Sequence, residues 1–433
     1  MGEALGLRRG GARPRPQLAA EIPARSQMKF VIEALGLTAG GGKQLALNLL
    51  AGLIKHEEHE FVLLLPNIPE YAVLSGPNLK RILYEQPPSL GGRYLHLHWT
   101  VPRICKEERA DALLCLGNFT PRNPPCPTVV LIHNPHLVYR EPVAETHKTF
   151  REKLIIAYGR YALRRLSPRV RVIIQTEVMR QRLVSSYKLD PRRVSIIPNS
   201  YMLPDDVGEN AAPWMRGRSE LFSFLCLTRY YTHKNLEILV EAVRSLSGYR
   251  QRAFRCLITI SADQHPGARK LINRIAREKL EHVLVNIGPV PSAKLAEAYR
   301  SADALILPTL LESFSRTYLE AMHFGLPILT SDRDFARGLC QDAALYFDPL
   351  DAESVARGMR QIMENRELRF HLASNGKRIL EQSPTWDGIA AEFVGALERA
   401  VGERAAREGS FGQAAGQRNR SSGVLPAEQV KKH

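Results

Sequence analysis

The sequence predicts an α/β protein with two doubly wound domains, each built on a parallel sheet covered by helices. Its 433 residues exceed what one hydrophobic core usually holds, so two domains are expected. Short apolar runs alternate with helical patterns along the chain, which is typical of doubly wound sheets. The predicted strands are residues 28–37, 60–65, 112–116, 128–132 and 170–176 in the first half, and 222–227, 256–260, 283–290, 305–307 and 327–330 in the second.

The composition indicates a globular protein of the cytoplasm. Hydrophobic residues make up 44% and charged residues 24% of the chain. No run of about 18 or more apolar residues suits a membrane-spanning helix. The 6 cysteines form no C-x-x-C pair and lie mostly in apolar runs, as reduced, buried thiols do. We therefore expect a cytoplasmic protein, or one held peripherally on the inner face of a membrane.

Positive charge is concentrated in the first half. Lysine and arginine total 60 against 44 acidic residues, a net charge of +16. Residues 28–200 hold 24 bases and 14 acids, whereas residues 201–400 hold 25 of each. This distribution suggests an anionic molecule or an anionic membrane surface as the partner of the first domain.

Residues 305–332, LILPTLLESFSRTYLEAMHFGLPILTSD, predict a strand, a loop, a helix and a second strand. Ser313 and Ser315 can cap the helix, and Gly325 can end it. Glu312 lies in the loop and Glu320 about one turn inside the helix. Both carboxylates can therefore face a cleft at the helix N-terminus, where free N–H groups attract phosphate. Alternatively, they are ordinary surface glutamates.

A glycine loop precedes the first predicted helix. Gly40, Gly41 and Gly42 are followed by Lys43, and the helix is expected from about residue 44 to 54. Backbone N–H groups of such a loop can approach an anion, although a triple glycine is also found in plain flexible turns.

Two groups of histidines are candidates for function. His133 and His136 follow the strand at 128–132, where open α/β sheets bind ligands, and His133 is a candidate hydrogen-bond donor to a ligand hydroxyl. His96 and His98 would share one face if residues 96–98 formed a strand, as in a metal site. No third ligand has a suitable spacing, so we predict no metal site.

Residues 146–166 predict a basic helix with an apolar side formed by Phe150, Leu154, Ala157, Tyr161 and Leu166. Two interpretations are open. The apolar side packs against the helix's own sheet, which is the commoner case, or the helix docks on an anionic membrane. In the second half, Arg229 and Lys234 follow the strand at 222–227 and put two cations beside a predicted helix N-terminus.

Residues 312–332 resemble the E-x7-E motif of retaining, nucleotide-sugar-dependent glycosyltransferases of family 4, whose two domains face a central cleft in the GT-B fold. Residues 228–235, TRYYTHKN, resemble the family's G-R-x4-K-N element, and residues 197–200, IPNS, its I-P-N-G corner. Serine replaces the family's usual glycine at 313, 315 and 200, and threonine replaces it at 228. The resemblance covers roughly residues 28–400.

The resemblance implies a role for each matched residue. Arg229 and Lys234 would hold the donor diphosphate, Glu320 the ribose and Glu312 the transferred hexose, and no metal or other cofactor would be needed. The implied catalytic residues are Glu312, Arg229, Lys234 and His133. The implied donor-binding residues are Gly41, Gly42, Lys43, Val290, Ser313, Phe314, Ser315 and Glu320. The partners would be a nucleotide sugar and a glycan or lipid-linked acceptor, and not a nucleic acid. A weaker likeness of residues 331–356 to bacterial polysaccharide mannosyl- and rhamnosyltransferases favours GDP-mannose or a GDP-deoxyhexose as donor, with a UDP-sugar as the alternative.

The expected organisation follows from these matches. The segments are a disordered or extraneous extension (1–27), an acceptor-binding domain (28–205), a hinge (206–217), a nucleotide-sugar domain (218–380), a helix returning to the first domain (381–402) and a disordered tail (403–433).

Other functions remain open from the sequence. A sugar-nucleotide epimerase or a glycogen-synthase-like polymerase would share the fold, but the epimerase's N-terminal acids and histidines are not recognisable. A catalytically silent GT-B scaffold is suggested by the serines at 313 and 315. The net positive charge suggests a nucleic-acid-binding protein, yet no binding-module motif is present.

Overall fold

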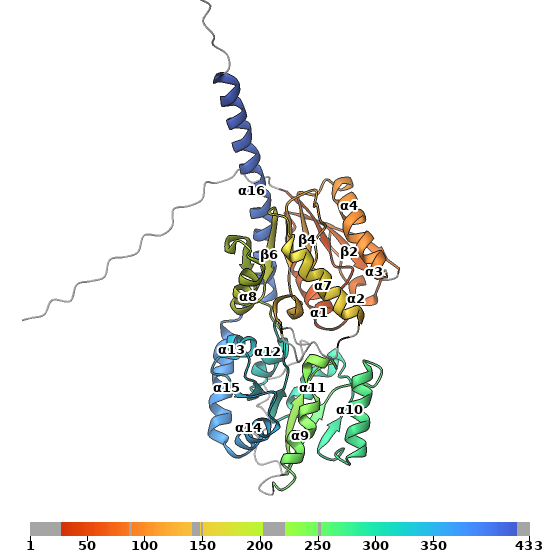
Figure 1. The fold of residues 1–433 in the computed structure, drawn as a ribbon, viewed down its shortest axis with the longest axis vertical. Coiled ribbons are helices and arrows are strands. Elements are labelled where there is room, and N and C mark those ends of the chain that lie inside the picture. Colours follow the sequence, from red (N-terminus) through yellow and green to blue (C-terminus); the bar gives the residue numbers. More distant parts are fainter. Residues whose placement is uncertain are drawn as a thin grey trace, which may run out of the picture.

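The computed structural model describes residues 27–85, 89–140, 148, 150–201, 221–249 and 253–421, with side chains up to residue 406. Two parallel sheets, of seven and six strands, form two domains one above the other (Figure 1). The predicted two-domain α/β fold is confirmed. The hinge expected at 206–217 and all of the extension expected at 1–27 except residue 27 lie outside the described residues.

The first domain has the strand order β3-β2-β1-β4-β5-β6-β7. Its strands are β1 (Lys29–Glu33), β2 (Glu60–Pro66), β3 (Leu79–Tyr84), β4 (Ala112–Cys115), β5 (Thr128–Leu131), β6 (Val170–Ile174) and β7 (Val194–Ile196). Its helices are α1 (Gly40–Leu53), α2 (Pro69–Ala72), α3 (Leu90–Leu95), η1 (His96–Thr100), α4 (Val101–Glu107), α5 (Pro135–Val138), α7 (Phe150–Arg164), α8 (Glu177–Tyr187) and η2 (Pro191–Arg193). Alternate residues of β1 point to opposite faces, with Phe30 and Ile32 packing toward α1 and Val31 toward α4 and α8.

The second domain has the strand order β10-β9-β8-β11-β12-β13. Its strands are β8 (Leu221–Cys226), β9 (Ala253–Ile258), β10 (Leu284–Asn286), β11 (Ala304–Leu307), β12 (Ile328–Ser331) and β13 (Ala344–Phe347). Its helices are η4 (Thr232–Lys234), α9 (Glu237–Ser245), α10 (Pro266–Arg277), η5 (Ser292–Lys294), α11 (Leu295–Arg300), α12 (Arg316–His323), α13 (Asp334–Cys340), α14 (Ala352–Glu364) and α15 (Arg366–Glu381).

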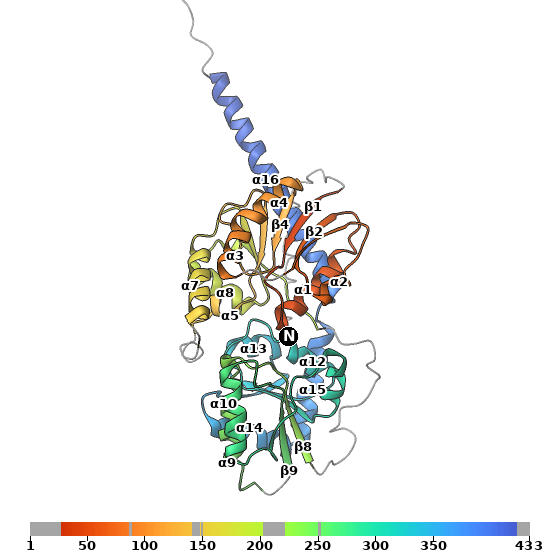
Figure 2. The ribbon, with the colours of Figure 1, turned by 90° about the vertical axis from the view of Figure 1, so that its right-hand side faces the viewer.

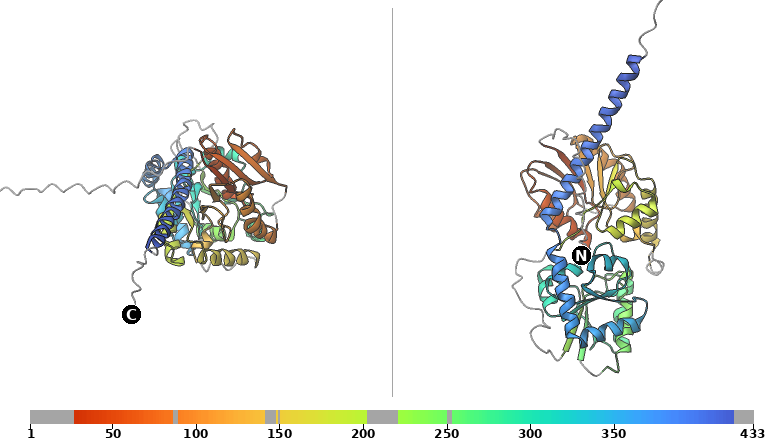
Figure 3. Two further views of the ribbon diagram at one scale, coloured as in Figure 1. Left: turned by 90° about the horizontal axis from the view of Figure 1, so that it is seen from above. Right: turned by 90° about the vertical axis from the view of Figure 1, so that its left-hand side faces the viewer.

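The last helix, α16 (Trp386–Ser421), leaves the second domain and crosses the first (Figure 3). Its side chains Phe393 and Leu397 are buried in the same cluster as the β1 and α1 residues. A Cβ added at Gly52 of α1 would lie 2.7 Å from the Cβ of Ala390, so only glycine allows the two helices to approach this closely. The expected return to the first domain is present. The helix, however, continues to Ser421, beyond residue 402, where the sequence analysis expected it to end and a disordered tail to begin.

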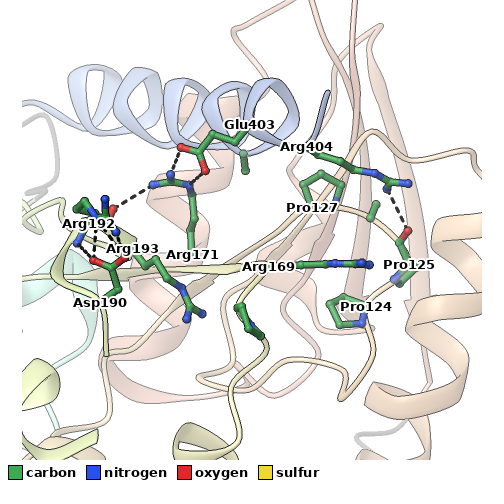
Figure 4. A pocket seen from close by; sticks show the side chains of 13 residues that line it. Pro124, Pro125, Pro127, Arg169, Arg171, Asp190, Arg192, Arg193, Glu403 and Arg404 are labelled. Atoms are coloured by element: carbon green, nitrogen blue, oxygen red, sulfur yellow. Dashed lines mark hydrogen bonds and ion pairs between the residues drawn. The ribbon is translucent and has the colours of Figure 1, made fainter. Parts of the chain in front are cut away.

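An ion pair and a hydrogen bond hold α16 at the end of the first sheet away from the second domain. Arg171 of β6 pairs bidentately with Glu403, and Arg404 donates to the Pro125 carbonyl over 3.3 Å (Figure 4). These residues line a hollow of about 570 Å³ with Asp190 and Arg192, which pair over 2.9 Å. The arginines of this hollow thus tie α16 and the strand starts together.

Three local expectations differ from the structure. Residues 96–98 are not a strand but belong to the π-helical turn η1, so His96 and His98 do not share a strand face. Helix α1 begins at Gly40 rather than at 44, which makes the glycines its first turn. On α7 the buried residues are Ile156, Gly159 and Leu163. Of the predicted apolar side, Phe150, Leu154, Ala157 and Tyr161 are exposed, whereas Leu166, after the end of the helix, is half-buried against the core.

Within the described residues, no helix combines the length and the apolar character needed to cross a bilayer. All six cysteines are buried with free thiols, as the sequence predicted.

The packing of α16 predicts a large cost for Leu397→Ala. The side chain is fully buried against the first domain, so its loss should lower the free energy of unfolding by about 2–5 kcal/mol, measured by urea denaturation. Glu392→Ala, on the exposed side of the same helix, is the control and should change it by less than about 0.5 kcal/mol. Equal stability of the two variants would contradict this packing.

Candidate active site

A cleft of about 780 Å³ lies between the two domains, at the carboxyl ends of both sheets. Loops that follow parallel strands end at one edge of each sheet, which is where such folds bind ligands. All the predicted site residues except Lys43 line it: Gly41, Gly42, His133, Arg229, Lys234, Val290, Glu312, Ser313, Phe314, Ser315 and Glu320. The folding of the chain therefore brings together residues that are more than two hundred positions apart in the sequence.

Glu312 and Lys234 form an ion pair inside the cleft. Both side chains are largely buried, at 12% and 16% exposure. Lys234 ends η4, and Glu312 lies in the loop between β11 and α12. The backbone N–H of Leu310, in that loop, donates to the His233 carbonyl over 2.8 Å and holds the two segments together. A ligand phosphate that approached Lys234 would therefore meet a cation already held in position by a carboxylate.

Glu320 is buried in α12, where its carboxylate is held from two sides. Tyr299 donates its hydroxyl proton to Glu320 Oε2 over 2.6 Å, and Arg316 Nη2 lies 4.0 Å from Oε1. Burial is the main cause that raises the pKa of Tyr299 well above its ordinary value, so the phenol stays protonated and remains a donor. The carboxylate is thus oriented to accept further hydrogen bonds from the cleft.

Two helix N-termini face the cleft from opposite walls. Helix α1 begins at Gly40 and α12 at Arg316, and neither N-cap residue, Ala39 or Ser315, makes a side-chain hydrogen bond to its helix. Uncapped N–H groups and the positive ends of the helix dipoles together favour an anion. Ser315 has φ −95°, an ordinary value for any residue. Serine is therefore accommodated there without the left-handed backbone that would require glycine.

His133 follows β5 and lies against α1. Its Nε2 donates to the Leu116 carbonyl over 3.0 Å, and its backbone N–H donates to Asn118 Oδ1 over 2.8 Å. Burial lowers the pKa of His133, which favours the neutral ring. A neutral ring with its proton on Nε2 has only Nδ1 left, as an acceptor. The expectation that His133 donates to a sugar hydroxyl is therefore revised: its Nδ1 can accept a hydrogen bond from one.

Lys148 and His233 line the cleft beside His136, and neither was singled out from the sequence. His136 Nδ1 lies 2.9 Å from Lys148 Nζ in the first domain, and its ring contacts His233 of the second domain at a centroid distance of 5.2 Å. Burial, followed by the fields of Lys234, His136 and Lys148, lowers the pKa of His233 well below its ordinary value. The motif at 133–136 and residues 232–235 contained these histidines, but only the fold shows that they meet.

Lys43 lies elsewhere. Its ammonium pairs with Glu70 of α2 and does not line the cleft, so its predicted donor-binding role has no support from its position. Among the described residues, no group of three or more His, Cys, Asp or Glu side chains could hold a metal ion. His98 instead contacts the Tyr158 hydroxyl over 2.7 Å.

Glu33, at the end of β1, is a buried acid just beneath the cleft floor. A Cβ added at Gly117, next to the cleft residue Asn118, would lie 3.3 Å from its Oε2. Its Oε1 accepts the Leu35 N–H over 3.0 Å and lies 4.0 Å from His96 Nε2. Burial raises the pKa of Glu33 from 4.5 to about 7, which outweighs the opposing Leu35 hydrogen bond. The acid therefore holds its proton near neutral pH.

A Glu33→Gln variant tests this buried acid. The folded chain binds the proton more tightly than the unfolded chain, so Glu33 contributes stability that is lost as the pH rises through about 7. Between pH 5 and 8 the wild type should lose about 2–3 kcal/mol of unfolding free energy from this group, and the variant should not. Urea denaturation at several pH values gives both profiles, and parallel profiles would refute the assignment.

Comparison with known proteins gives the family. The model described as Glycosyltransferase Family 4 matches residues 39–201, and the model described as Glycosyl transferases group 1 matches residues 217–379. The chain is 26% identical over 244 residues to mannosylfructose-phosphate synthase of Agrobacterium fabrum, covering 52% of each protein. It is 31% identical over 140 residues to the GDP-mannose-dependent alpha-mannosyltransferase of Mycolicibacterium smegmatis, covering 31% of this chain and 36% of that protein.

The fold is found again among solved structures. HepE of Anabaena, solved in complex with UDP-glucose, matches with a TM-score of 0.65 at 15% identity, over 86% of this chain and 100% of that chain. The chain spans about half the length of the curated relatives it matches. Two sheets around one cleft and matches to both family models lead to one conclusion: the chain belongs to the glycosyltransferases of family 4, with the GT-B fold.

Proposed function

We propose that this protein is a retaining hexosyltransferase. It moves a hexose from a nucleoside-diphosphate sugar to a glycan or lipid-linked acceptor in the synthesis of a cell-surface polysaccharide, without a metal ion. The observation that carries the proposal is the ion pair of Glu312 and Lys234 beside the N-terminus of α12, in a cleft that also contains Arg229 and Glu320.

The donor is proposed to lie on the second domain. Its diphosphate meets Arg229, Lys234 and the N–H groups of Ser313 to Thr317, at the positive end of α12. Glu320, held by Tyr299, accepts hydrogen bonds from the ribose hydroxyls, and Glu312 accepts hydrogen bonds from the hexose hydroxyls. Val290, also in the cleft lining, lies beside the base.

Positive groups that are already fixed stabilise the leaving diphosphate as its charge grows. Arg229, Lys234 and the α12 dipole stabilise this negative charge, as a metal ion does in other transferases. The acceptor hydroxyl attacks from the face that the diphosphate leaves, and a phosphate oxygen takes its proton. His133, with Nδ1 as an acceptor, orients a hexose hydroxyl from the first domain.

The donor is proposed to be GDP-mannose or a GDP-deoxyhexose, with a UDP-sugar as the second choice. The support is the likeness to a relative named for GDP-mannose. HepE, a structural neighbour, was solved with UDP-glucose, which keeps the second choice open.

The acceptor is proposed to reach the cleft along the first domain. That domain carries the chain's excess of positive charge, and Lys148 extends it into the cleft. An acceptor with a phosphate or diphosphate group, such as a lipid-linked glycan, fits these cations.

The first test is nucleotide binding to the wild type and to Glu320→Ala, in EDTA. GDP, UDP, ADP and dTDP and their sugars are compared by thermal shift. A ligand at about 100 times its Kd adds about 2.7 kcal/mol to the free energy of unfolding and raises the midpoint clearly. We expect a shift with one nucleotide, lost in Glu320→Ala and kept in Glu297→Ala, an exposed control on α11. No shift with any nucleotide, or one that needs a metal, would count against the proposal.

Glu312→Gln tests the assignment of the hexose. The variant keeps the shape and removes the charge, so it should bind the nucleoside diphosphate as the wild type does and lose about 100-fold or more in kcat. Transfer is measured with the donor found above, and proton NMR of the product reports its anomeric configuration. Inversion of configuration would exclude a retaining reaction, and a loss of nucleotide binding would assign Glu312 to the diphosphate instead.

A further inference from the structure

Helix α7 turns its apolar side away from the protein. Ile156, Gly159 and Leu163 are buried against the first domain. On the opposite side, Phe150, Leu154 and Tyr161 are 83%, 53% and 53% exposed, and Ala157 between them is exposed too. These four residues recur at helical spacing and form one line along the helix, which we name the α7 crest. A helix that served only the domain core would place polar residues there.

Exposed apolar residues of a neighbouring segment, two of them aromatic, extend the surface of the crest. In Figure 2, α3 lies beside α7 on the first domain. Tyr94, Leu95 and Trp99, at the end of α3 and in η1, are 45%, 56% and 60% exposed. Tyr158 of α7 links the two groups, because its ring is 5.9 Å from that of Tyr94. Six large exposed apolar side chains therefore lie on two adjacent segments of one domain.

Positive charges border the crest on both sides. Arg151 and Arg165 follow one side of the helix, and Lys153 and Arg164 the other, and all four are exposed. Arg165 lies over the Tyr161 ring, 5.6 Å from its centroid. Glu152, the one acid within residues 150–165, lines the cleft instead. The outward half of α7 is thus apolar at its centre and cationic at its borders.

We propose that the α7 crest, with Tyr94, Leu95 and Trp99, is the surface by which this protein lies on an anionic phospholipid bilayer. Apolar side chains enter the boundary between headgroups and acyl chains, tyrosine and tryptophan stay at headgroup level, and the flanking lysine and arginines meet lipid phosphates.

The same helix forms part of the cleft. Glu152, Ile155 and Ile156 line the cleft from one side of α7, while the crest faces outward from the other. An acceptor anchored in the bilayer would therefore enter the cleft along α7. This last step rests on the proposed function, whereas lipid binding does not.

Vesicle sedimentation of the full chain tests the surface. The vesicles are phosphatidylcholine alone and phosphatidylcholine with phosphatidylglycerol. We expect binding to the anionic vesicles, weakened by salt, and a fall in partitioning of about tenfold or more for Leu154→Glu with Tyr161→Glu. For the double variant Arg164→Gln with Arg165→Gln, partitioning onto anionic vesicles should fall about 30-fold, with no change on phosphatidylcholine alone. Phe370→Glu, which changes an exposed aromatic of α15 in the second domain, is the matched control and should bind like wild type.

Three outcomes would overturn the inference. The first is that the wild type does not bind anionic vesicles, and the second is that both double variants bind them as fully as the wild type. The third is that the wild type self-associates in solution and the Leu154→Glu and Tyr161→Glu changes abolish this, since a second copy would then cover the crest. The nucleotide thermal shift is measured on the same variants and should be unchanged, because none of the altered residues lines the cleft. Absence of that shift in the wild type would count against the proposed function alone.

Discussion

The parallel direction of every described strand pairing determines where the chemistry of this protein can be located. In a parallel sheet all strands end at one edge, so each loop that follows a strand opens there. In this chain both edges face one cleft. Gly41 after β1, His133 after β5, Lys234 after β8 and Glu312 after β11 meet because they follow strands, although the sequence separates the first and last widely. The composition of the site therefore depends on sheet direction more than on any single contact.

Electrostatics in the cleft point to an anionic ligand. Lys148 and His136 approach from one domain and His233 and Lys234 from the other, and their mutual repulsion contributes to the low pKa of His233. Two uncapped helix N-termini add to the same field. Glu312 offsets part of it by pairing with Lys234. These groups would neutralise the charge of a bound diphosphate, and the proposed reaction without a metal ion is based on this arrangement.

The sequence was sufficient for the two-domain fold and for most of the cleft lining, because buried strands and the E-x7-E spacing leave strong local patterns. It failed where the outcome depends on tertiary packing. Strand β3 was not predicted, since on an edge its side chains are mostly exposed or half-buried. The helical spacing of the apolar residues in α7 showed which of them share a face, but not that this face points outward. Lys43 follows the glycines, yet the helix start at Gly40 directs it to Glu70.

The path of α16 has a consequence for how the protein is made. Phe393 and Leu397 complete the hydrophobic core of the first domain, but they follow the last residues of the second domain in the chain. Domains made on the ribosome generally fold in order of synthesis, N-terminal first. Here the first domain emerges without the helix that covers α1, β4 and β5, and these apolar surfaces are covered only after the whole second domain has been translated. Its folding is therefore coupled to the completion of the chain.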